Sequence, residues 1–348
     1  MRAHGPVLLV VDQPATIGAL PVAVALDEGV TVAYLPGLAM RRIADLHPGA
    51  AKTDARDAAV IANAARTMPH TLRSLKIDDE TIAELTVMSG FDDDLAQQIT
   101  ATSNRIRGLL TQIHPALERV LGPRLDHPAV LDLFETWPTP AALTSAGKSR
   151  VRTRLLKKAP RLGGRLTEEI FAALAAQTVV VTGTNAAGVV LPRLAAQLAA
   201  LRQQRAEVAE KVEELVAAHP LSKVLMTMPG VGVRTCARIL TEVVGKDFPT
   251  AGHLASYAGL APVTRRSGTS IRGEHPPRGG NKVLKRALFL SAFAALSDPV
   301  SRAYYDRKRA QQKKHNEALI ALARRRVDVL YAMLRDNKPY AHPTPAAA

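Results

Sequence analysis

Residues 191–215 read LPRLAAQLAALRQQRAEVAEKVEEL, and this stretch predicts a long helix with a hydrophobic seam. Apolar residues recur at heptad spacing over about three and a half heptads, with one polar interruption at Arg205. The seam consists of Leu191, Leu194, Leu198, Leu201, Arg205, Val208, Val212 and Leu215. Such a helix packs within its own chain or dimerises as a coiled coil, and the sequence favours neither alternative, although a polar seam residue can set the register of a dimer.

Helical patterns dominate the chain around this stretch. From about Asp78 apolar residues fall at helical spacing as far as Leu117, and Asp92-Asp93-Asp94 is interpreted as a solvated helix start. Residues 121–188 are broken by proline and glycine, which predicts short helices and turns.

The N-terminal stretch has a different pattern. Val7–Val11 and Val30–Leu35 are continuous apolar runs, typical of buried strands, and Ile17–Leu26 between them predicts a short helix. This is a strand–helix–strand unit of parallel-sheet type. A basic helix around Met40 follows, and then Thr53 is a suitable N-cap for a helix that runs to about Arg66.

Composition points to a polyanionic partner. The chain has 348 residues and a formal net charge of +15, which indicates nucleic acid first. A membrane-surface protein would need large apolar anchors, and aromatic residues make up only 4%. One cysteine, Cys236, excludes an internal disulfide, and we find no signal or transmembrane segment. We therefore expect a cytoplasmic protein that does not enter membranes.

The C-terminal third predicts two helices around a glycine turn, then a basic loop and more helices. Its segments are a helix over 222–228, the turn Pro229-Gly230-Val231-Gly232, a helix over 234–244, a polar loop over 265–280, a helix over 282–295, a very basic stretch over 302–314, a last helix over 317–334 and a disordered end over 343–348.

Three acidic residues are candidate metal ligands. Asp54 and Asp57 are three residues apart on one helix face, and Asp12 follows the first strand, where ligands gather in open α/β sheets. Together such carboxylates can hold Mg²⁺ for phosphoryl transfer. The alternative is a helix N-terminus that favours acidic residues through its dipole, and spacing alone favours this alternative.

The turn with Gly230 and Gly232 resembles the hairpin of a helix-hairpin-helix module. Small glycines let backbone N–H groups approach a phosphate at a helix start, and this contact would be independent of base sequence. A plain turn between packed helices is the alternative, and the basic surroundings favour the phosphate. Cys236 then faces the helix interior and is interpreted as a packing residue.

Hydroxyl groups stand among arginines in the stretch from Arg265 through Arg266 and Ser267 to Arg272. Arginines stabilise the charge that develops on a phosphate, and a hydroxyl can attack it. Local chemistry alone favours a simpler phosphate-binding loop. Arg278 and Lys282 extend the basic surface into the next helix.

In their order and separation, three segments together resemble one family. They are Lys52–Ala58, Met228–Gly232, and Tyr257–Pro262 leading to Ser267-Gly268. The chain resembles the insertion-sequence DEDD transposases related to the Piv/MooV DNA invertases, from about Val7 to Tyr340.

The resemblance implies a mainly α chain with a small α/β part. Its expected divisions are a partial RuvC-like (RNase H-type) domain over 1–75, a helical coiled-coil linker over 76–220, a C-terminal transposase domain with a helix-hairpin-helix over 221–340, and a disordered tail over 341–348.

The resemblance also implies the chemistry. Four acids in the order Asp, Glu, Asp, Asp bind Mg²⁺ in the family; Asp54 and Asp57 match the last two, and Asp12 matches the second. Ser267 matches the nucleophile that forms a phosphoserine link to DNA. Some members are guided by an RNA that the element encodes, and a homodimer or homotetramer is expected.

The chain departs from the family at its start. The strand that carries the first acid should precede residue 1, which leads us to expect a truncated copy or a misassigned start, an incomplete sheet and impaired catalysis. Two alternatives stay open: a catalytically inactive remnant that binds DNA or RNA, and a RuvC-type structure-specific nuclease.

Overall fold

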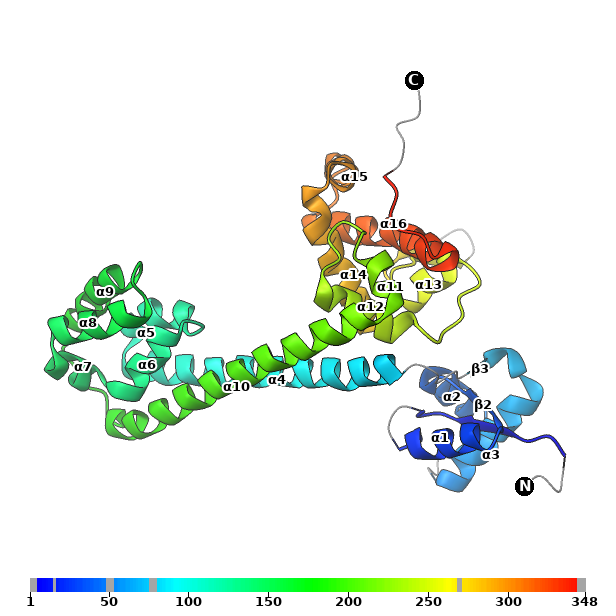
Figure 1. Cartoon of the computed structure of the whole chain (residues 1–348), viewed down its shortest axis with the longest axis horizontal. Coiled ribbons are helices and arrows are strands. Elements are labelled where there is room, and N and C mark those ends of the chain that lie inside the picture. Colours follow the sequence, from blue (N-terminus) through cyan, green and yellow to red (C-terminus); the bar gives the residue numbers. More distant parts are fainter. Residues whose placement is uncertain (1–4, 15–16, 48–52, 75–79, 268–270, 343–348) are drawn as a thin grey trace. The chain divides into compact units, whose positions relative to one another are not determined.

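The computed structural model describes residues 5–14, 17–47, 53–74, 80–267 and 271–342, and it is mainly α-helical (Figure 1). The chain divides into two compact units, one made of residues 1–85 together with 215–348 and the other of residues 86–214. The mainly α architecture with a small α/β part agrees with the prediction.

The N-terminal part contains the predicted strand–helix–strand unit. β1 (Leu8–Val11) pairs in parallel with β2 (Thr31–Tyr34), with Leu8 opposite Thr31, and α1 (Ala19–Asp27) connects them. The sequence predicted two strands, but the sheet has three, because β3 (Arg73–Ser74) pairs antiparallel with β2. A strand of two residues leaves no periodic pattern, so it was missed.

Helices cover both faces of this small sheet. Val22 and Ala25 of α1 pack with Val32 of β2 on one face. On the other face the buried cluster comes from the end of β2, from α2 (Gly37–Ala44) and from α3 (Asp54–Thr67); it consists of Leu35, Met40, Ile43, Val60 and Ala64. Alternation along the strands thus supplies two apolar faces.

The second unit is built on two long helices, α4 (Glu80–Ile113) and α10 (Thr184–Ala218), which run alongside one another (Figure 1). Every apolar seam residue of the predicted heptad is buried. Five short helices fill the connection, as the breaks in the sequence predicted: α5 (Pro115–Leu121), α6 (Pro128–Thr136), α7 (Pro140–Ala146), α8 (Lys148–Lys158) and α9 (Gly163–Ala175). Ile106 and Leu110 of α4 share one core with Leu191 and Leu198 of α10.

Arg205, the polar residue of the seam, has its partner within the chain. Its guanidinium donates to both carboxylate oxygens of Asp92 on α4, at 2.8 and 3.2 Å. The hydrogen bond to Asp92 raises the pKa of Arg205. Asp92 lies inside α4 and makes a half-buried ion pair, so its interpretation as a solvated helix start was wrong. The seam therefore packs within one chain.

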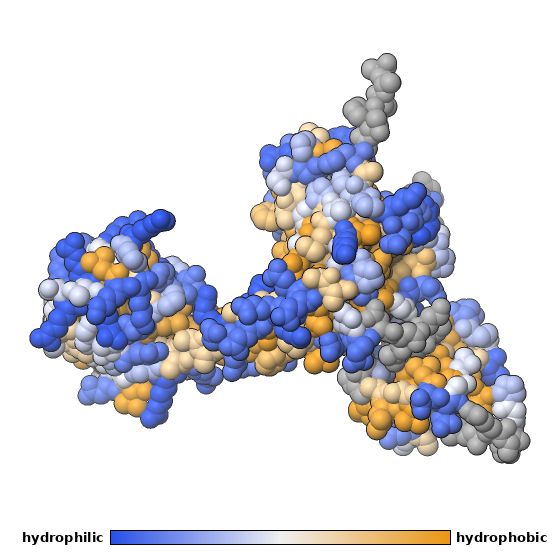
Figure 2. All heavy atoms as spheres, viewed as in Figure 1, coloured by the Kyte–Doolittle hydropathy of each residue, from blue (hydrophilic) through white to orange (hydrophobic). Residues whose placement is uncertain are grey.

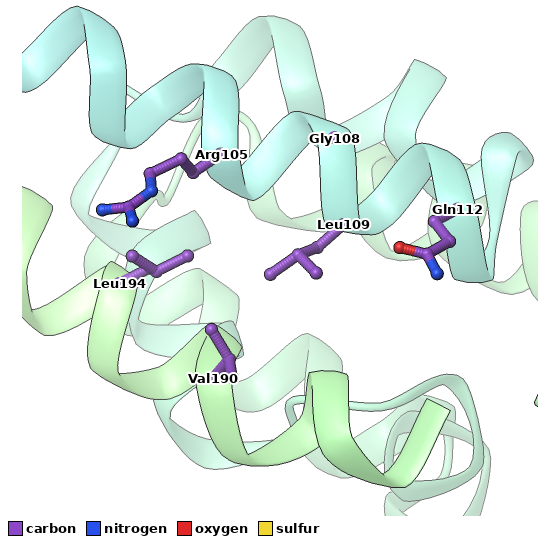
Figure 3. Close-up of a pocket in the computed structure, with 6 residues that line it drawn as sticks. All are labelled: Arg105, Gly108, Leu109, Gln112, Val190 and Leu194. Atoms are coloured by element: carbon purple, nitrogen blue, oxygen red, sulfur yellow. The ribbon is translucent and has the colours of Figure 1, made fainter. Parts of the chain in front are cut away.

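A pocket of about 400 Å³ opens between the two long helices (Figure 3). Leu109 of α4 faces Val190 and Leu194 of α10 across it, with Arg105 and Gln112 at its sides.

The C-terminal part is a helical cluster with one β-hairpin. Its elements are α11 (Pro220–Leu225), α12 (Val233–Val243), α13 (Ala251–Tyr257), β4 (Val263–Ser267), β5 (Ile271–His275), α14 (Lys282–Ala294), α15 (Pro299–Ala310) and α16 (His315–Asp336). α14 and α16 pack together, with α12 against α14 and with α13 and α15 against α16. The two helices around the glycine turn are α11 and α12, as predicted.

The polar stretch over 265–280, predicted as a loop, is largely the antiparallel hairpin of β4 and β5. Its strands are too short and too polar to show apolar alternation, so the sequence favoured a loop. The disorder predicted for 343–348 lies outside the described residues.

Candidate active site

The predicted acids line one cavity in the N-terminal part. Asp12 follows β1, and the first turn of α3 carries Asp54 and Asp57. The hydroxyl of Thr53 accepts from the backbone N–H of Arg56 at 3.3 Å, which confirms Thr53 as the N-cap. All three carboxylates border a cavity of about 1530 Å³. The helix start and the strand end thus bring them to one place.

Hard carboxylate oxygens are suitable ligands for a divalent cation, so the donor types fit the metal that the family class implies. Within the described residues, however, no three acidic, histidine or cysteine side chains form a ready ligand group. Cations also border the cavity, among them Arg56, which donates to the carbonyl of His47 at 3.0 Å. The three acids therefore line one cavity, but among the described residues they do not form a complete set of metal ligands.

The turn between α11 and α12 is fixed by packing. Gly230 has φ +76°, and a Cβ there would lie 2.6 Å from the backbone nitrogen of Ala295. The buried guanidinium of Arg326 on α16 donates to the carbonyl of Pro229 and to the hydroxyl of Ser291. Gly230 therefore has a packing role without any phosphate, which supports the plain-turn alternative at this position.

Gly232 differs from Gly230 in its surroundings. It is the N-cap of α12, no side chain caps this helix start, and a Cβ at Gly232 would meet nothing within 4 Å. Backbone N–H groups at an open helix start suit an anion. The predicted phosphate contact therefore stays a prediction for Gly232.

The β4–β5 hairpin, called the serine hairpin here because β4 ends at Ser267, joins the helical cluster where the backbones of Gly259 and Gly280 approach closely; this junction is called the neck. Gly259 has φ +64° and Gly280 has φ +105°. A Cβ on Gly280 would lie 2.6 Å from the nitrogen of Gly259, and a Cβ on Gly259 would lie 2.8 Å from the carbonyl oxygen of Gly279. The backbone N–H of Asn281 also donates to the carbonyl of Tyr257 at 2.7 Å. Two segments some twenty residues apart are thus closed into the base of the hairpin.

A polar cluster that the sequence did not reveal supports this neck. The side-chain amide of Asn281 donates to Glu242 and, at 2.9 Å, to the hydroxyl of Tyr257. The other end of that amide accepts from the backbone N–H of Leu284 at 2.9 Å, which caps α14. The ammonium of Lys246 lies 3.5 Å from the carboxylate of Glu242. These partners come from three helices and the neck, so no local pattern identifies them.

Ser267 is the last residue of β4, and its backbone is paired with Ile271. The three residues after it lie outside the described part. Arg265 is opposite Gly273, and Arg266 is opposite Arg272.

Exposed cations continue from the neck of the hairpin into α14. Arg278 and Lys282 are both exposed, and neither makes an ion pair within the described part of the chain. They are separated from the serine position by the length of the hairpin strands. The arrangement offers positive charge on both sides of the neck.

An acid-lined cavity in a small α/β part, a serine at the end of a hairpin strand and a formal net charge of +15 suit a protein that acts on nucleic acid. Residues 1–115 match a family of transposases, and residues 222–306 match the transposase IS116/IS110/IS902 family.

Relatives extend these matches over almost the whole chain. The chain is 62% identical over 344 residues to the 43.6 kDa protein of insertion element IS110 from Streptomyces coelicolor, covering 98% of this chain and 85% of the relative. It is 37% identical over 347 residues to the 42 kDa protein of insertion element IS900 from Mycobacterium paratuberculosis, covering 99% and 86%. A shorter match, 34% identical over 123 residues, links 34% of this chain to 38% of the pilin gene-inverting protein of Moraxella bovis.

This chain belongs to the IS110/IS116/IS902 family of insertion-sequence transposases, and its function is transposition or recombination of DNA. Across the described residues, no helix is both long and apolar enough to span a bilayer.

Proposed function

We propose that Ser267 is the nucleophile of DNA strand exchange. Its oxygen attacks a backbone phosphorus, a new serine–phosphate ester forms, and the bond from phosphorus to one deoxyribose oxygen breaks. The serine proton passes to solvent or a base, and the released deoxyribose oxygen takes up a proton. Attack by a hydroxyl of the exchanged strand reverses these steps and frees the serine, so no external energy source is needed. The observation that carries the proposal is the place of Ser267 at the end of a hairpin held by the Gly259–Gly280 neck.

The arginines divide into two groups. Arg265, Arg266 and Arg272 lie on the two strands that carry and oppose Ser267, so they stabilise the phosphate under attack. Arg278 and Lys282, near the base of the hairpin, hold neighbouring phosphates of the strand. Gly232 adds a backbone contact at the start of α12.

Asp12, Asp54 and Asp57 hold Mg²⁺ in this proposal. When bound, the ion supplies positive charge at a phosphate oxygen. We also propose that the chain has domains over 1–75, 76–220 and 221–340. The protein forms a homo-oligomer, is guided by an RNA that the element encodes, and acts in the cytoplasm.

Covalent trapping tests the serine. The full chain is incubated with Mg²⁺ and a labelled duplex made from the genomic sequences that flank its coding sequence, with and without RNA transcribed from those flanks. Wild type should give a labelled band that survives denaturation and disappears after protease treatment. S267A should give no such band and should still bind the duplex. S256A, which alters an exposed serine of α13, is the matched control and should behave as wild type.

Each failure has a distinct meaning. Cleavage by S267A without an adduct would replace the serine mechanism by a metal-dependent nuclease. Binding without an adduct in wild type under every condition would indicate a binding remnant. Adduct formation at the wild-type level by R265Q/R266Q/R272Q would contradict the role of these arginines.

A further inference from the structure

Helix α8 of the second unit carries an unusual concentration of positive charge. Its sequence, KSRVRTRLLKK, has six cations in 11 residues and no acid. Arg161 and Arg165 continue the series, and the first acid after them is Glu168. Hydrophilic residues cover most of the face that α8 and α9 present in Figure 2.

Some of these cations have structural partners. Arg154 and Lys158 share the carboxylate of Asp132 on α6, at 2.5 and 2.8 Å, and Lys148 lies 2.5 Å from Glu168. These pairs fasten α8 to its neighbours. They leave four cations without an ion pair within the described residues, and all four are exposed: Arg150, Arg152, Lys157 and Arg161.

The four free cations are mounted on a fixed base. Val151 and Leu155 of α8 are completely buried, and Ala159, directly after the helix, is buried in the same core. Cations at i and i+4 along α8, such as Arg150 and Arg154, repel one another. A bound polyanion would reduce this repulsion.

We propose that α8 and the turn after it form a second DNA-binding surface, one that grips the phosphate backbone of duplex DNA without reading base sequence. The 11-residue helix extends over about 16 Å at 1.5 Å per residue. Two or three phosphates of one strand fit this length. The surface lies outside the serine module and acts independently of strand cleavage.

Duplex DNA fits this surface better than single-stranded RNA. Recognition of single strands relies on bases stacked on aromatic rings. No aromatic residue occurs over 148–165, and the Trp137 ring is already contacted by the guanidinium of Arg154, 5.8 Å from its centre. Trp137 is also packed against the core. The surface thus offers charge without a stacking platform.

Salt-dependent binding tests the proposal. The full chain, carrying S267A throughout so that cleavage plays no part, is measured by fluorescence anisotropy on a 30-base-pair duplex of arbitrary sequence. The variant R150Q/R152Q/K157Q/R161Q should reduce the slope of log affinity against log salt by about 2–3, since each lost phosphate contact contributes about 0.9. At physiological salt its affinity should fall at least tenfold. Circular dichroism should show an unchanged helix content.

The matched control is R105Q/R119Q/R193Q/R202Q. It removes the same charge from the same unit, at positions on α4, α5 and α10 that also lack ion pairs within the described residues. Its slope should fall by less than 1. Equal losses in the two variants would reduce the effect to net charge and overturn the proposal. A loss on an RNA hairpin with unchanged duplex binding would overturn it as well. Because no adduct is measured, neither result bears on Ser267 as the nucleophile.

Discussion

Replacing Gly280 by alanine should damage the neck of the serine hairpin. Gly280 has φ +105°, a conformation that residues with a Cβ rarely adopt, and the added carbon would approach the backbone nitrogen of Gly259 to 2.6 Å. The atoms that must give way, the nitrogen and Cα of Gly259, belong to the main chain. The strain therefore cannot be relieved by turning a side chain.

The expected cost has two parts. Backbone strain at such a φ costs about 1–3 kcal/mol. Forcing a methyl group into a filled space costs about 1–3 kcal/mol more. The sum is about 2–6 kcal/mol, and at about 2–4 °C per kcal/mol it lowers the melting temperature by roughly 4–24 °C.

Gly279→Ala is the matched control. A Cβ on Gly279 would meet nothing within 4 Å, and both substitutions stiffen the unfolded chain equally. Scanning calorimetry of both variants beside wild type isolates the strain in the native state. Hydrogen exchange of the β4–β5 amides should also be faster in G280A, with adduct formation lost. Melting temperatures of G280A and G279A within about 1 °C of each other would refute the reasoning.

Three further predictions concern buried groups. Arg326→Ala should lower the free energy of unfolding by about 2–5 kcal/mol, because it empties a buried site and leaves the carbonyl of Pro229 without its partner. Arg326→Met also loses the hydrogen bond but fills the space, so it should lose less; equal losses in urea unfolding would contradict this. Burial alone would raise the pKa of Asp132, but hydrogen bonds from Arg154 and Lys158 lower it overall. The stability that these bonds give is thus present above the unfolded pKa and is lost as pH falls through the lower native pKa, so D132N should lose less stability than wild type below about pH 4. Burial raises the pKa of Cys236 to about 12, so its thiol should react with a disulfide reagent at pH 8 only after unfolding; fast reaction of the folded chain would disprove this.

Local patterns predicted most of the helices and part of the acidic site. The heptad of α10 depends only on the spacing of apolar residues along the chain. The cap at Thr53 depends on one hydrogen bond to a residue three positions away. Both features can therefore be predicted from the sequence. The gathering of Asp12 with Asp54 and Asp57 around one cavity follows from strand order and helix start. Whether these acids hold an ion depends on distances that spacing does not specify.

Other features depend on contacts across long separations in the chain. Asp92 looked solvated because its partner, Arg205, is 113 residues away. The predicted loop over 265–280 is a hairpin because the neck brings Gly259 against Gly280. Glu242, Tyr257 and Asn281 form one polar cluster from separate segments.

The sequence by itself determined the helical character, the strand–helix–strand unit, the basic charge and the serine motif, since periodicity, capping and net charge are local or additive properties. Only the tertiary structure decided which glycine serves packing and which cations of α8 are free of acidic partners within the described residues. The physical reason is that burial, close backbone approach and ion pairing depend on which distant residues meet. Arg205, the polar residue of the heptad, is paired with Asp92 because α4 packs against α10.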